Sequence, residues 1–138
     1  MVNVPAVRRV IASLKGELPE TQNLGFNMGV YINTPIATQP DHSGRNCDWI
    51  ACVSGHAYIL EIGCSYQQAR DEDPDEIEEI AQLYMGLSYE QANDLFFDLP
   101  AGLTLDWIPL DYVIGVLERL IVTGEVRWFE EEAYVQAA

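Results

Sequence analysis

Positive charge is what this sequence has least of. Its 138 residues include seven Lys and Arg side chains against 22 Asp and Glu, which gives a formal net charge of -15. From Asp48 onward three basic residues accompany nineteen acidic ones, whereas the residues before Asp48 carry a net charge of +1. Nucleic acids and anionic membranes would repel such a chain, so we expect no direct binding to either. A basic protein is the complementary partner, although charge of this kind also serves solubility alone.

The sequence also lacks a long apolar run and an export signal. The stretch from Trp49 to Leu60 is interrupted at residues 54–56, and it falls short of the roughly 20 residues that span a bilayer. No leucine-rich stretch or small-residue cleavage site follows Arg8 and Arg9. The three cysteines are an odd number, which favours reduced thiols over a disulfide scaffold. We therefore expect a cytoplasmic protein.

The length and the apolar content predict one domain that covers residues 1–138, because a chain of this size buries a core without disulfides or metals. Within it we distinguish a first helix (1–17), a Pro- and Gly-rich segment (18–46), a helical core (47–129) and an acidic tail (130–138). Apolar residues at helical spacing define the first helix, and Gly16 is placed to end it.

Residues 48–62 are apolar nearly all round, which is typical of a buried central helix, and Gly63 is placed to end this helix. The preceding residues 33–46 predict a long surface loop, and such loops are either contact surfaces or mobile. A β-prone run at 30–32 is the candidate partner of a short strand at 126–129.

Capping signals define the remaining helices. Asp73 and Ser88 each begin a capping box, and these predict an acidic helix and a short helix. A last helix is expected from about Pro109 to Gly124. Together these elements predict a mostly α fold, with about five helices around a buried central helix and a small two-stranded β pairing.

Three cysteines and a histidine form the most distinctive group of potential ligands. Cys47, Cys52, His56 and Cys64 offer the donors of a tetrahedral zinc site, but their spacing lacks the usual paired knuckles. Cysteines in an apolar segment also serve packing alone. A reactive thiol is a further alternative, with Cys47 near the start of the central helix and His56 or His42 as its base. Apart from zinc, we expect no cofactor.

Catalytic motifs are missing from the sequence. It has no phosphate-binding glycine loop and no GxSxG elbow, and the acidic run at 71–76 lacks the glycine and alternating ligands of an EF-hand. The sequence therefore favours a binding protein over an enzyme.

Three segments carry a resemblance: Phe26-Asn27-Met28-Gly29, Cys47-x4-Cys52-x2-Gly55-His56-Ala57, and Leu87-Ser88-x2-Gln91-Ala92-x2-Leu95-Phe96. Together they resemble a family of small bacterial and phage proteins of unknown function. That family has an FDMG-like segment, a C-G-T-x-x-C-x-A-G-[WH]-A segment and an L-G-L-[ST]-x-x-Q-A-x-x-L-F helix. Here Asp48-Trp49 replaces Gly-Thr. Relatives often carry Trp at the position of His56, which implies that His56 is not an obligatory ligand. The resemblance implies a bacterium or a phage-infected host cell as the setting, and no known activity.

The charge distribution leads to an acidic protein-interaction module as the expected function. In a phage or mobile element, the specific hypothesis is an inhibitor of the anti-CRISPR or anti-restriction type, which mimics nucleic-acid charge and blocks a basic host defence protein. The expected acidic face comprises Glu61, Asp71, Glu72, Asp73, Asp75, Glu76, Glu78, Glu79, Glu90, Asp94 and Asp98, together with the glutamates at 130–132.

Two alternatives stay open. One is a protein with a structural metal or thiol site at the Cys/His group. The other is an accessory domain that oligomerises through an exposed apolar patch at Trp107, Trp128 and Phe129. The sequence leaves the oligomeric state and the identity of a partner undetermined.

Overall fold

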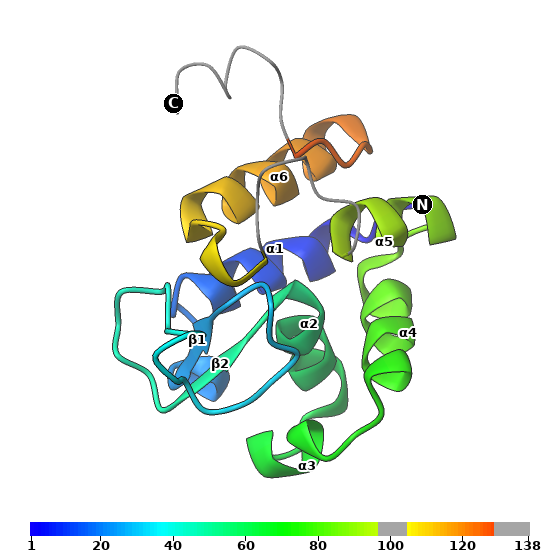
Figure 1. Ribbon diagram of the computed structural model, residues 1–138. Coiled ribbons are helices and arrows are strands. Elements are labelled where there is room, and N and C mark those ends of the chain that lie inside the picture. The colour runs from blue at the N-terminus through cyan, green and yellow to red at the C-terminus, as the bar shows by residue number, and fades with distance from the viewer. Residues whose placement is uncertain (97–104, 129–138) are drawn as a thin grey trace.

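The computed structural model describes residues 1–96 and 105–128. This part of the chain is mostly helical, as the sequence predicts, with six α-helices where about five were expected and a two-stranded parallel sheet. Helix α1 lies between α6 and α2, and α4 packs against α2 (Figure 1). The elements are α1 (Val4–Leu14), η1 (Pro19–Thr21), β1 (Leu24–Phe26), β2 (Trp49–Ala51), α2 (Val53–Ile62), α3 (Tyr66–Arg70), α4 (Pro74–Met85), α5 (Tyr89–Phe96), η2 (Leu105–Trp107) and α6 (Leu110–Thr123).

The predicted central helix is shorter than expected, because its first residues form a strand. Helix α2 begins at Val53, and the residues before it form β2, which pairs in parallel with β1. Ile50 is bonded on its other side as well, since its N–H donates to the Asn33 carbonyl at 2.8 Å. An apolar run that is buried on every side has the same sequence pattern as a helix or as a strand. Residues 49–51 form a strand because they are hydrogen-bonded to β1 and to Asn33, which lie far away in the sequence.

The predicted pairing of residues 30–32 with 126–129 is wrong for the part of it that the structure describes. Residues 126–128 are not a strand, and Phe129 lies outside the described residues. Trp128 is buried instead, and its Nε1 donates to the Asp94 carbonyl at 2.7 Å. At 30–32 the chain runs beside β2, where the Val30 carbonyl accepts from Cys52 N. The sheet partner of β2 is thus β1.

Local capping signals fix the ends of the helices. Gly63, Gly86 and Gly124 adopt the left-handed conformation that ends α2, α4 and α6. The capping box at Ser88 is confirmed, with Ser88 N donating to the Gln91 side chain at 2.8 Å and Gln91 N to the Ser88 hydroxyl at 3.1 Å. A second box, at Ser65, begins the short helix α3, which was not predicted from the sequence. The signal Ser-x-x-Gln was present there too.

Helix α2 is the central element of the core. Val53 and Ala57 face a large cluster that is shared with α1, α5 and α6. Tyr58 and Ile59 face a smaller cluster that includes Ile77 of α4. The predicted central position of this helix is therefore confirmed, despite its later start. Within the described ranges no helix has both the length and the apolar character that crossing a membrane requires.

At Gly55 the backbone of α2 lies close to the backbone of Tyr31, and a mutation can test this contact. A Cβ at this position would collide with the Tyr31 carbonyl oxygen, so Gly55→Ala should lower the free energy of unfolding by about 1–3 kcal/mol. The matched control is Gly115→Ala in α6, where an added Cβ meets nothing within 4 Å. The control should gain up to about 1 kcal/mol. Urea unfolding of both variants measures the difference, and equal midpoints would contradict the close packing.

Candidate functional site

The four candidate zinc ligands are not gathered into one site. No three His, Cys, Asp or Glu side chains within the described ranges are placed to hold a metal ion. Cys47 lies before β2, and its thiol donates to the Gln22 carbonyl at 3.5 Å. Cys52 caps α2, and its Sγ lies 3.0 Å from the Ser54 hydroxyl. Cys64 follows the end of α2 and is half-buried. This geometry gives the zinc hypothesis no support.

His56 has a structural environment. The side chain is fully buried, its Nδ1 lies 2.6 Å from the Ser13 hydroxyl, and its Nε2 lies 2.7 Å from the Gly25 carbonyl oxygen. Because a carbonyl only accepts, Nε2 carries the proton and donates it. The Ser13 hydroxyl also lies 2.8 Å from that of Thr21. Burial lowers the pKa of His56 to about 4, against the opposing effect of the Gly25 bond, so the ring is neutral near pH 7.

The expected reactive thiol has no base beside it. Cys47 precedes a strand, so it does not occupy the helix start that was predicted for it; Cys52 does. Burial raises the pKa of the Cys52 thiol, which keeps it protonated at neutral pH. Both ring nitrogens of His56 are engaged, and Nε2 of His42 lies 2.6 Å from the Asp106 carbonyl. Neither imidazole is positioned as the base of a nucleophilic cysteine.

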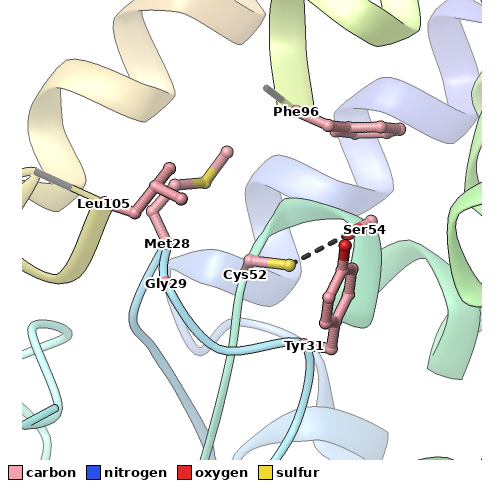
Figure 2. Close-up of a pocket in the computed structure, with 7 residues that line it drawn as sticks. All are labelled: Met28, Gly29, Tyr31, Cys52, Ser54, Phe96 and Leu105. Atoms are coloured by element: carbon pink, nitrogen blue, oxygen red, sulfur yellow. Dashed lines mark hydrogen bonds between the residues drawn. The ribbon is translucent and has the colours of Figure 1, made fainter. Parts of the chain in front are cut away.

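A small cavity adjoins Cys52. Figure 2 shows Met28 and Leu105 on one side of it and Tyr31 and Phe96 on the other, with Cys52 between them. Its volume is about 70 Å³. Pockets that bind small molecules measure roughly 300–1,000 Å³. We therefore assign no small-molecule ligand to this cavity.

The loop at 33–46 is tied to the sheet by Asp41. One oxygen of this carboxylate accepts from the N–H groups of Phe26 at 3.1 Å and Ser43 at 2.8 Å, and the other accepts from Cys47 N at 2.9 Å. Burial on its own would raise the pKa of Asp41, but these hydrogen bonds outweigh it and lower the pKa. Hydrogen bonds from main-chain N–H groups to the Asp41 side chain therefore fix the path of the loop.

Of the two described members of the predicted apolar patch, Trp107 is exposed and Trp128 is not. Trp107 is 59% exposed, and its ring meets His42 edge-on with the centroids 5.4 Å apart. Trp128 is only 6% exposed, so its inclusion in the patch was wrong. Phe129 lies outside the described residues. The oligomerisation hypothesis thus loses Trp128 from the surface on which it depended.

The predicted acidic residues divide among separate regions. Glu61 lies at the end of α2, while Glu90 and Asp94 border a hollow with Gly124 and Arg127 beyond the end of α6. Asp98 and the glutamates at 130–132 lie outside the described residues. The densest group lies on α4 and in the three residues before it. Every member of this group is exposed except Glu78, which is half-buried. We call this group the acidic surface: Asp71, Glu72, Asp73, Asp75, Glu76, Glu78 and Glu79.

The acidic surface has few cations near it in the sequence. No Lys or Arg occurs between Arg70 and Arg119, a stretch that includes all of α4 and α5. Among the ion pairs between described residues, the weak contact of Arg70 with Asp71 at 3.8 Å is the one that reaches this surface. Glu78 accepts a hydrogen bond from the Tyr31 hydroxyl, and burial raises the pKa of Glu78. Within the described part of the chain, the surface thus concentrates negative charge that meets only this one weak ion pair.

Two aromatic side chains beside the acidic surface were not predicted from the sequence. Tyr31 is distant in the chain from Glu78, so no local pattern could place it there. Tyr89 is 80% exposed at the start of α5. Its spacing of three and seven residues from the buried Ala92 and Phe96 was a usable signal, since such residues share a helix face.

The neutral state of His56 predicts a dependence of stability on pH. An unfolded His takes up a proton near pH 6.5, whereas His56 in the folded protein does so near pH 4. The stability from this group is therefore fully present above about pH 6.5, and about 3 kcal/mol is lost as the pH falls to 4. Urea unfolding from pH 7 to pH 4 measures this loss.

His56→Gln is the control for this prediction, because it should be less stable at pH 7 and should lack this pH-dependent loss. Asp41, with its lowered pKa, adds a loss of the same sign only below its ordinary value of 3.8. An NMR titration in which the His56 ring protonates near 6.5 would contradict the burial argument.

Comparison with known proteins gives no family for this chain: no family model, curated protein or solved structure matches it. The resemblance described above therefore stays a prediction. Its three segments do share a physical environment, since Phe26, Met28, Cys52, Ala57 and Leu95 all belong to the large core cluster.

Proposed function

We propose that the protein is an acidic protein-interaction module whose acidic surface binds a basic region of another protein. The observation that carries this proposal is the charge of α4. Four of its twelve residues are carboxylates, and neither α4 nor α5 contains a Lys or Arg. A cationic partner surface would supply the missing counter-charge.

Helix stability alone does not account for this charge. Asp75 and Glu76 lie in the first turn of α4, where the helix dipole favours negative side chains. Glu78 and Glu79 lie beyond that turn and gain little from the dipole. Glu79 is also four residues from Asp75 and three from Glu76, and like charges at this spacing destabilise a helix. Carboxylates that oppose helix stability support a role in binding.

The specific form of the proposal is an inhibitor that mimics the charge of nucleic acid. In a phage-infected or bacterial cell, its target would be a basic defence protein, as for inhibitors of the anti-CRISPR or anti-restriction type. Negative charge at the acidic surface would compete for the cationic groups that normally hold phosphates. The support for this form is the sign and concentration of the charge.

The proposal predicts salt-sensitive binding. Tagged protein should retain a basic, nucleic-acid-binding protein from host lysate and release it at moderate salt, because screening weakens contacts between exposed charges. In the purified pair, Asp75→Asn and Glu79→Gln should each weaken the affinity about two- to fivefold. Glu118→Gln, an exposed glutamate on α6, is the control and should have little effect. An affinity that stays constant from low to high salt would refute the charge-based mechanism.

A further inference from the structure

A groove runs between α4 and α5, with a volume of about 170 Å³. Each helix contributes one face to it, because the lining residues on each helix follow the spacing i, i+3, i+4 and i+7. The lining from α4 consists of Asp75, Glu78, Glu79 and Gln82, and the lining from α5 consists of Tyr89, Ala92, Asn93 and Phe96.

The groove has an apolar floor between two different walls. Ala92 and Phe96 are buried and form the floor. Asp75 and Glu79 are exposed along the α4 wall, beside the half-buried Glu78. The α5 wall presents the exposed ring of Tyr89. An apolar floor, an acidic wall and an aromatic wall together fit a side chain with an alkyl stem and a cationic head.

We propose that this groove receives an arginine side chain from the basic partner, an inference that rests on the proposed function. The methylene stem would lie over Ala92 and Phe96, while the planar guanidinium stacks on Tyr89 and donates to Glu79 and Asp75. Arginine fits better than lysine, because its fork of donors can reach two carboxylates at once and its plane can stack on an aromatic ring.

A single metal ion does not fit this groove. Calcium takes six to eight oxygen ligands that converge on one point. The carboxylates of the groove do not converge in this way, since no three acidic, His or Cys side chains in the described parts of the chain could hold a metal ion together. Carboxylates spread along a wall suit a wide guanidinium instead.

The test is an NMR titration of the ¹⁵N-labelled protein with the capped peptide Gly-Gly-Arg-Gly-Gly at millimolar concentration. We expect shifts of backbone amides at the groove residues of α4 and α5. A matched peptide with citrulline, which keeps the shape and loses the charge, should cause no such shifts, and a lysine peptide should bind more weakly. Tyr89→Ala and Glu79→Gln should each weaken the binding of the arginine peptide about two- to fivefold.

Glu118→Gln is the control, because it removes the same charge from an exposed position on α6 that lies outside both the acidic surface and the groove. This variant should change the affinity by less than twofold. Equal losses from Glu118→Gln and Glu79→Gln, binding of the citrulline peptide, or no shifts in the groove would each overturn the arginine site. These results would leave the proposed function standing if partner binding still responds to salt and to Asp75→Asn, so the two failures are distinguishable.

Discussion

The packing of α1, α2 and β1 against one another depends on the neutral imidazole of His56 in the interior of the protein. His56 joins α2 to α1 through Ser13 and to β1 through the Gly25 carbonyl. A buried polar ring is tolerated because both of its nitrogens are bonded, and removing either partner would leave an unsatisfied group that costs stability. Nearby, Arg45 reaches the carbonyls of Leu14 and Leu24, so the end of α1 and the start of the sheet are held from two sides.

The packing of α4 against α2 determines where the acidic surface lies. Helix α2 packs against α4, and Ile77 and Ala81 are buried on the inner side of α4. With its apolar side fixed in this way, α4 must present the carboxylates of its other positions to solvent. A binding surface on a packed helix loses little conformational freedom when a partner binds, which favours affinity. The stability of the core and the presentation of charge are thus linked through α2.

Local signals explain which features could be predicted from the sequence. Gly63, Gly124 and the Ser88 box act within a few residues, so the helix ends that depend on them were predictable. Strand β2 was not, because its identity depends on bonds to β1 and to Asn33, which are distant in the chain. The candidate site was likewise predictable in part. Composition identified the acidic residues, but only tertiary structure separates the groove at α4 from Glu90 on the other side of α5.

We propose that the acidic surface contacts a basic partner. Amide hydrogen exchange, measured on the free protein and on its complex with the captured partner, locates this contact. We expect slower exchange on binding in α4 and α5, with α1 and α6 unchanged. Protection confined to α6, or to the loop at 33–46 and Trp107, would place the interface on another face and refute binding through the acidic surface.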